Sequence, residues 1–115
     1  MLDPAVVARV RAYIQAVRAK GIEVRFVVVF GSWAKGRADT WSDIDVVVVS
    51  PQFDGGIRRS DVNTLWRVAG ETDTRIEPIA CGERQWVEDD ASAIIEIARR
   101  EGQRIDPEEV ELPRV

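Results

Sequence analysis

The first twenty residues show apolar and polar positions in a helical pattern. Apolar side chains recur at spacings of three and four, at Val7, Val10, Ile14 and Val17. This spacing places one apolar stripe on a helix. Asp3 and Pro4 suit the N-cap and the first helical position, and Gly21 suits the position beyond the C-terminus. The pattern therefore predicts a helix that begins at Pro4 and ends near Lys20.

Three later segments have the pattern of β-strands. Residues 23–30 and 44–49 are nearly continuous runs of apolar, mostly β-branched side chains, which predicts strands buried on both faces of a sheet. Residues 75–81 predict a third strand. Because Pro78 cannot donate a hydrogen bond to a neighbouring strand, we expect this strand at a sheet edge or at a bulge.

Helical patterns follow the second and third predicted strands. We expect a helix that begins at Ser60 or Asp61 and ends at Gly70. The apolar residues it carries are Val62, Leu65, Trp66 and Ala69. Residues 83–89 predict a short helical turn, and residues 91–100 predict a last helix. The expected inward face of that helix consists of Ile94, Ile97 and Ala98.

The order helix, strand, loop, strand, helix, strand, helix predicts an α/β (α+β) fold, a small sheet with helices packed against it. The 115 residues fit one domain. We expect this domain to span residues 1–105, followed by a loose tail over residues 106–115. Residues 53–60, which include two adjacent glycines, predict a mobile surface loop.

The composition excludes several kinds of chemistry. The sequence has no histidine and a single cysteine, Cys81, which rules out histidine-based triads, an intramolecular disulfide and the usual zinc sites. We expect Cys81 to be an inert buried thiol. A metal would have to be a hard cation held by oxygen, such as Mg²⁺ or Mn²⁺. The net charge of −4 argues against strong nucleic-acid binding.

The chain has neither the long apolar run of a membrane span nor the pattern of a signal peptide. We therefore expect a cytoplasmic protein without membrane association. Trp33 and Trp41 could stack on a nucleobase, but packing or a protein interface is the favoured interpretation. Trp66 and Trp86 are expected in the core or at an interface. Tyr13 is expected to be half-buried rather than an acceptor in catalysis.

Acidic residues stand on two predicted strands. Asp43 and Asp45 are two positions apart, so their side chains leave the same face of the second strand. Adjacent carboxylates repel each other and lose hydration, and a divalent cation between them relieves both costs. Glu77 on the third strand is the candidate third ligand, with Asp73 in reserve. Alternatively, Asp43 and Asp45 form a solvated strand end and Glu77 pairs with Arg75.

A polar loop precedes the two aspartates. Gly31 ends a predicted strand and lets the backbone approach a ligand closely. Ser32 offers a hydroxyl and an N–H at the start of a short helix expected over residues 33–35, where anions bind well. Lys35 and Arg37 would add positive charge for a triphosphate, and a plain solvated loop is the equally weighted alternative. A phosphate cradle joined to a metal-binding pair describes a nucleoside triphosphate site.

The Gly-Ser pair at residues 31–32, ten further residues and Asp-Ile-Asp at residues 43–45 resemble the signature of the polymerase-beta-like nucleotidyltransferases. The resemblance is closest to the minimal members of that superfamily, the MNT proteins that are often paired with HEPN toxins. It covers residues 6–105, because residues 95–102 also resemble the family's closing helix. The motif in its strand context is far more specific than either half alone.

The resemblance implies roles for individual residues. Gly31 and Ser32 would hold the β- and γ-phosphates of ATP, while Asp43 and Asp45 would bind two Mg²⁺ ions, for which Mn²⁺ could substitute. Glu77 falls at the position of the family's third acid, which is often aspartate. The expected nucleotide contacts are completed by Lys35, Arg37 and Ser42.

The resemblance also implies a reaction and a partner. A hydroxyl would attack the α-phosphorus, pyrophosphate would leave, and the third carboxylate would orient or deprotonate the hydroxyl. The leading hypothesis is an antitoxin that transfers AMP from ATP to a tyrosine of a HEPN-type toxin. One alternative is a non-catalytic, nucleotide-binding antitoxin that neutralises its partner by contact. A less favoured one is a small-molecule adenylyltransferase of the aminoglycoside type.

Overall fold

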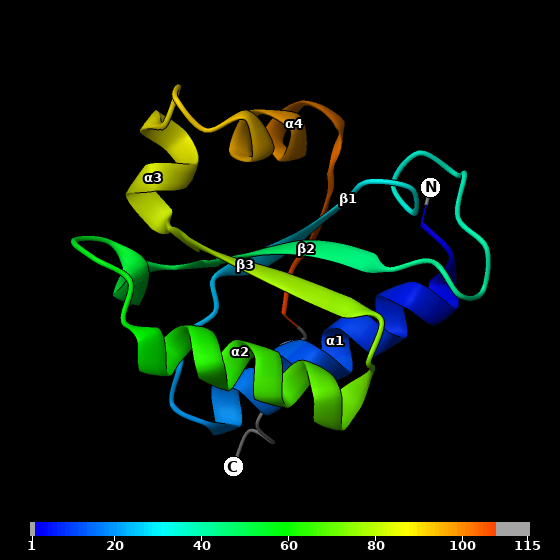
Figure 1. Cartoon of the computed structure of the whole chain (residues 1–115), viewed down its shortest axis with the longest axis horizontal. Helices are drawn as coiled ribbons and strands as arrows, with labels where there is room; N and C mark the ends of the chain where they lie inside the picture. The colour runs from blue at the N-terminus through cyan, green and yellow to red at the C-terminus, as the bar shows by residue number, and fades with distance from the viewer. Residues whose placement is uncertain (1, 108–115) are drawn as a thin grey trace, which may run out of the picture.

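A four-stranded mixed sheet forms the middle layer of the protein (Figure 1). The computed structural model describes residues 2–107. The strands are β1 (Phe26–Phe30), β2 (Ile44–Ser50), β3 (Ile76–Gly82) and β4 (Gln103–Ile105). They lie in the order β3-β2-β1-β4, in which β1 is antiparallel to both of its neighbours and β2 is parallel to β3.

Helices cover both faces of this sheet (Figure 1). The helices are α1 (Pro4–Ala19), α2 (Arg59–Thr72), α3 (Glu83–Glu88) and α4 (Ala93–Glu101). α1 and α2 lie on one face, and α3 and α4 lie on the other. Successive strand side chains point to opposite faces, so even-numbered residues of β2 pack toward α1 and α2 while odd-numbered residues pack toward α4. The predicted fold class and the double-sided burial of β1 and β2 are confirmed.

The N-terminal prediction is also confirmed. The Asp3 carboxylate accepts a hydrogen bond from the backbone N–H of Ala5 at 2.8 Å, and Pro4 is the first helical residue. The predicted stripe faces the core, with Val10, Ile14 and Val17 buried and Val7 partly buried. Strand β1 begins three residues later than expected, and β3 occupies a sheet edge, as its proline indicates.

The predicted limits of α2 are wrong at both ends. The helix begins at Arg59 after an N-cap residue, Arg58, that makes no side-chain capping bond, and it continues through Gly70. A glycine inside a helix costs only about 1 kcal/mol relative to alanine, which packing against the sheet offsets. Leu65, Val68 and Ala69 face the core. Trp66, expected in the core or at an interface, lies on another side of the helix and is 49 % exposed.

The inward face of α4 differs from the prediction. Ile95 and Ala98 are buried, whereas Ile94 and Ile97 are 47 % and 37 % exposed. The helix begins later than expected, because Ser92 is its N-cap and accepts a hydrogen bond from the Ile95 N–H at 3.3 Å. A nine-residue helix carries so few turns that its apolar residues are compatible with more than one inward face.

Strand β4 was not predicted. Its three residues Gln-Arg-Ile are too short and too polar for a strand pattern, and only their pairing with β1 defines them. Residues 53–60, expected as a surface loop, begin with Phe53, which ends a 3₁₀ turn and is buried in the core. Of the tail expected over residues 106–115, residues 108–115 lie outside the described part of the chain. None of the described helices is both long and apolar enough to cross a membrane.

Candidate active site

The three predicted acids meet at one end of the sheet. The end of β1 lies there beside the beginnings of β2 and β3, because β1 is antiparallel to β2 and β3 is parallel to β2. Asp45 is in register with Phe30 of β1 on one side and with Glu77 of β3 on the other. Asp43 is exposed and directly precedes β2. The strand pairing thus places Asp43, Asp45 and Glu77 together.

These carboxylates act on one another. A hydrogen bond between the side chains of Asp45 and Glu77 requires that one of them carries a proton, and the charge of Asp43 influences the pKa of both. Desolvation and, after it, the charge of Asp43 raise the pKa of Asp45, although its hydrogen bond with Glu77 works in the opposite direction. Desolvation and the charges of Asp43 and Asp45 raise the pKa of Glu77. Gathering like charges at a strand end is unfavourable without a counter-charge, and a cation would supply it.

The chemistry of this acid cluster suits a hard metal ion. It offers only carboxylate oxygens, which are the ligands that Mg²⁺ and Mn²⁺ prefer. Within residues 2–107, no three or more carboxylate, histidine or cysteine side chains are already gathered as a metal site. The fit therefore rests on the donor type and on the position of the three acids at one end of the sheet, and metal binding by them stays a prediction.

Gly31 packs directly against the acid cluster. Its φ of +76° is a left-handed conformation that L side chains rarely adopt. A Cβ atom placed on it would also lie 2.6 Å from the Oδ2 atom of Asp45. Glycine at this position therefore does more than open the backbone to a ligand, because it makes room for the Asp45 carboxylate.

The loop after Gly31 is a series of turns, so the helix predicted over residues 33–35 is wrong. The Lys35 N–H donates to the Gly31 carbonyl at 3.2 Å, and the Arg37 N–H donates to the Ser32 carbonyl at 2.9 Å. The second of these bonds spans five residues, which an α-helix does not allow. Ser32 is half-buried next to Gly31, and its role in a phosphate cradle stays a prediction.

Three further residues were predicted to contact the nucleotide: Lys35, Arg37 and Ser42. Two of them, Lys35 and Ser42, contact other protein side chains. The Lys35 ammonium forms an ion pair with Glu101 at the end of α4, at 3.1 Å. The Ser42 hydroxyl accepts from the Asp39 N–H at 3.0 Å and donates to the Asp39 carboxylate at 3.3 Å. Arg37 is exposed on the loop. A triphosphate would have to compete with Glu101 for Lys35.

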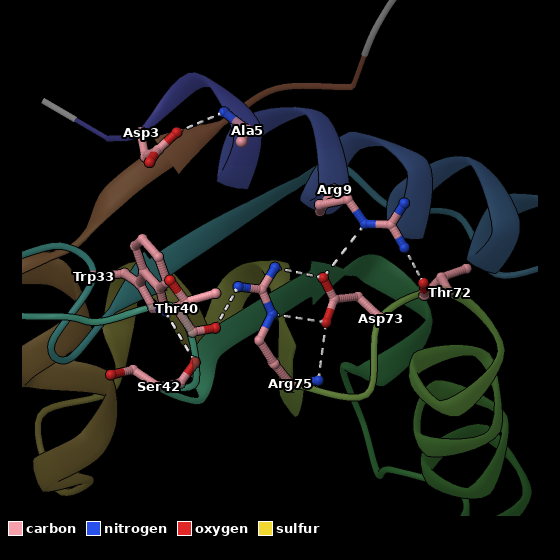
Figure 2. A network of polar contacts seen from close by, with 9 residues as sticks. All are labelled: Asp3, Ala5, Arg9, Trp33, Thr40, Ser42, Thr72, Asp73 and Arg75. Carbon is pink, nitrogen blue, oxygen red and sulfur yellow. Dashed lines mark hydrogen bonds and ion pairs between the residues drawn. The ribbon is translucent and has the colours of Figure 1, made fainter.

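Asp73, the reserve ligand, belongs to a separate ion-pair network (Figure 2). Its carboxylate accepts from the Arg75 guanidinium at 2.7 and 3.0 Å and from Arg9 at 3.4 Å. The hydrogen bonds from Arg75 lower the pKa of Asp73 to about 2. The alternative in which Arg75 pairs with Glu77 is wrong, since Arg75 pairs with Asp73. The Asp-x-Arg spacing could have indicated this pair from the sequence.

The aromatic residues near the loop play different roles. Trp33 packs against the core, and its indole N–H donates to the Ser42 carbonyl at 3.1 Å. Trp41 is 87 % exposed, so packing within the domain holds for Trp33 only, and a protein interface at Trp41 stays a prediction. Tyr13 is fully buried and donates to the Leu65 carbonyl at 2.9 Å, which removes it as an acceptor.

The remaining predictions on buried side chains are mostly confirmed. Trp86 is partly buried and packs edge-on against Phe26, with ring centroids 5.8 Å apart, so it packs against the core, one of the two places expected for it. Cys81 is a buried free thiol, and desolvation raises its pKa to about 12. At neutral pH this thiol is protonated and inert.

The sequence profile described as nucleotidyltransferase domain matches residues 10–106. The chain belongs to this nucleotidyltransferase family. The matched region contains the whole sheet and every candidate residue from Gly31 to Glu77. No curated protein matches the chain.

Solved structures agree with the fold of this nucleotidyltransferase domain. A protein of Sulfolobus solfataricus, provisionally assigned as a nucleotidyltransferase, aligns with a TM-score of 0.54 and 20 % identity over 69 % of this chain and 68 % of its own. A toxin-antitoxin crystal structure with AMP-PNP aligns with a TM-score of 0.57 and 17 % identity, over 85 % of this chain and 73 % of its own. At these identities the likeness shows the fold, which is that of the polymerase-beta-like nucleotidyltransferases.

Proposed function

We propose that this domain transfers AMP from ATP to a hydroxyl group in a reaction that depends on Mg²⁺, or on Mn²⁺ in its place. The proposal rests on the place of the three acids in the sheet. Asp45 is in register with Glu77 and follows Asp43 by two residues, and its carboxylate lies against Gly31, the residue directly after β1. Family membership supports the class of reaction. The absence of histidine from the sequence leaves carboxylates as the available general bases.

Each residue has a task in this proposal. Asp43 and Asp45 hold the divalent ions, two of which would neutralise the triphosphate and the charge that develops at the α-phosphorus. Glu77 orients the acceptor hydroxyl and takes its proton as the new O–P bond forms and the bond to pyrophosphate breaks. The raised pKa of Glu77 suits a group that accepts a proton. Gly31 and Ser32 bind the β- and γ-phosphates through the backbone and the hydroxyl.

The acceptor in this proposal is a tyrosine of a HEPN-type toxin, and the domain acts as its cytoplasmic antitoxin. One observation supports a protein acceptor. The fold is similar to that of a toxin-antitoxin structure containing AMP-PNP, and AMP-PNP is an ATP analogue.

Incubation with ATP labelled at the α-phosphate, Mg²⁺ and a HEPN-type partner encoded beside the gene tests the proposal. We expect label on the partner, loss of transfer in Asp43→Ala, and retention in the control Asp90→Ala, which changes an exposed acid beyond α3. No transfer by the wild type, or unchanged transfer by Asp43→Ala, would overturn the proposal. Neutralisation of the toxin by an Asp43→Asn, Asp45→Asn variant would instead favour the non-catalytic antitoxin.

A further inference from the structure

Arg75 holds both sides of Asp43. Its guanidinium donates to the Thr40 carbonyl at 3.1 Å, three residues before Asp43. Its backbone carbonyl accepts from the Ile44 N–H at 2.7 Å, one residue after Asp43. Arg75 itself is two residues before Glu77. One residue therefore connects the loop that leads into the first acid with the strand that carries the third.

Trp33 provides a second contact to the loop before Asp43 (Figure 2). The Arg75 guanidinium lies over the Trp33 ring, 5.7 Å from its centroid. The Trp33 indole N–H donates to the carbonyl of Ser42, the residue directly before Asp43. The backbone on either side of Asp43 is thus anchored, through Ser42 to Trp33 and through Ile44 to Arg75.

Contacts with Asp73, which follows α2, hold the Arg75 guanidinium in its orientation. Asp73 accepts from two nitrogens of Arg75 and also from its backbone N–H, at 3.0 Å. Arg9 of α1 donates to the same carboxylate and to the Thr72 carbonyl at the end of α2 (Figure 2). The planar fork of an arginine bound in this bidentate way has a defined direction that a lysine ammonium lacks.

We propose that Arg75 is a positioning residue of the transfer reaction, which fixes the loop 31–43 against the start of β3 so that Asp43 and Asp45 face Glu77. The inference rests on the proposed function, because it assigns the geometry of that same site. The Arg75 side chain is 26 % exposed, and its contacts are polar apart from the ring of the partly buried Trp33, so its removal leaves the fully buried core unchanged. Its loss should therefore affect the geometry of the site more than the folding of the domain.

The test compares Arg75→Gln, Arg75→Lys and Arg25→Gln in full-length protein. Arg25 is a matched control, since it is likewise a partly exposed arginine in ion pairs, with Glu23 and Glu83 at 3.2 and 3.0 Å. It contacts the carbonyl of Val49 at the far end of β2. The measurements are kcat and KM for ATP in the transfer assay, hydrogen exchange of the amides of residues 40–44, the NMR signal of the Trp33 indole N–H, and Tm.

For Arg75→Gln we expect kcat to fall about 10- to 100-fold, because small misplacements of catalytic groups have effects of this size. KM for ATP should change less than about threefold, since the phosphate contacts remain. Exchange at residues 40–44 should rise and the Trp33 signal should shift. Arg75→Lys should restore part of kcat, and Arg25→Gln should match the wild type.

Two results would overturn the inference: wild-type kcat in Arg75→Gln, or a loss of kcat in folded Arg75→Gln without faster exchange at residues 40–44. Should Arg75→Gln not fold, Asp73→Asn removes the acceptor that orients the guanidinium and should lower kcat in the same direction; wild-type kcat in that variant would also overturn the inference. Failure of the proposed function is distinct from these results, because then the wild type itself transfers no label.

Discussion

The Asp45 carboxylate occupies the space that a side chain on Gly31 would need, with Oδ2 2.6 Å from the position of a Cβ atom there. Asp45 belongs to β2, whereas Gly31 lies in the turn directly after β1 and has a left-handed φ of +76°. The glycine of the motif and its second aspartate are thus one steric unit. A side chain cannot be added at Gly31 without moving the Asp45 carboxylate.

Gly31→Ala should separate backbone strain from displacement of Asp45. Left-handed backbone at a non-glycine residue costs about 1–2 kcal/mol, and the clash adds little because the Asp45 carboxylate can rotate away. Gly21→Ala is the matched control, with a φ of +93° and nothing within 4 Å. Urea unfolding should show similar losses for both, while nucleotide transfer should fall at least about tenfold only in Gly31→Ala. Equal transfer activities of Gly31→Ala and Gly21→Ala would show that the contact between Gly31 and Asp45 does not matter for the reaction.

Divalent metal should stabilise the domain through the acid cluster. Mg²⁺ that binds only the folded state adds about 2.7 kcal/mol at 100 times its Kd. We therefore expect Mg²⁺ to raise Tm in the wild type and in Asp90→Asn, but not in an Asp43→Asn, Asp45→Asn double variant. EDTA should reverse the shift. Differential scanning fluorimetry with and without Mg²⁺ makes the measurement, and an equal shift in the double variant would place the metal elsewhere.

Glu77→Gln should have opposite consequences without and with Mg²⁺. The pKa values of Asp45 and Glu77 are raised in the folded state, so near these pKa values the folded state binds more protons than the unfolded state. The metal-free domain therefore loses stability as the pH rises and these two carboxyl groups lose their protons. Removing the Glu77 charge should leave the metal-free Tm unchanged or higher. The same variant should respond less to Mg²⁺, whose effect on the wild type should grow from pH 5 to pH 8 because metal competes with protons. If Glu77→Gln had a lower Tm than the wild type in EDTA, this account would be refuted.

Asp73 should make stability depend on acid pH. Its folded pKa of about 2 is below the usual value of 3.8, so its contribution is complete above about pH 4 and is lost as pH falls toward 2. Because the Arg9 partner is partly exposed to solvent, we expect Asp73→Asn to cost about 1–2 kcal/mol at pH 7 and roughly a third of that at pH 2.5. Asp106→Asn, which breaks an exposed pair with Arg104, should cost less than about 0.5 kcal/mol. Urea titrations at both pH values decide this.

The two loop tryptophans should differ in stability effect. Trp33→Phe keeps a ring but loses the hydrogen bond to the Ser42 carbonyl, which should cost about 1 kcal/mol. Trp41 is 87 % exposed, so Trp41→Phe should change the free energy of unfolding by less than about 0.5 kcal/mol. Chemical denaturation of both variants provides the comparison. A larger loss for Trp41→Phe would mean that its side chain packs in solution.

Local sequence pattern predicted the parts of the fold that depend on neighbours along the chain. The stripe on α1, the double-sided burial of β1 and β2, and the edge position of β3 all follow from the spacing of apolar residues and a proline. The acids could be placed together because strand alternation fixes the face of Asp45 and Glu77. Their register across β2 and β3 follows from tertiary pairing, which sequence spacing does not encode.

What the sequence did not reveal depends on contacts between distant residues. Strand β4 exists because Arg104 pairs with Val28, and its three residues carry no periodicity. Lys35 was assigned to phosphate because its partner, Glu101, is more than sixty residues away. Arg75 was read only as a neighbour of Glu77, whereas its side chain reaches Thr40. Such contacts are set by how the strands and helices pack.

The edge position of Pro78 has a consequence for how this protein meets other chains. The Arg75 carbonyl points toward β2, and in a parallel strand alternate residues direct their backbone groups to opposite sides. Pro78, three positions on, therefore faces away from β2, where its missing N–H costs the sheet no hydrogen bond. The same gap interrupts the row of donors along the outer edge, which protects the sheet from edge-to-edge aggregation and strand exchange.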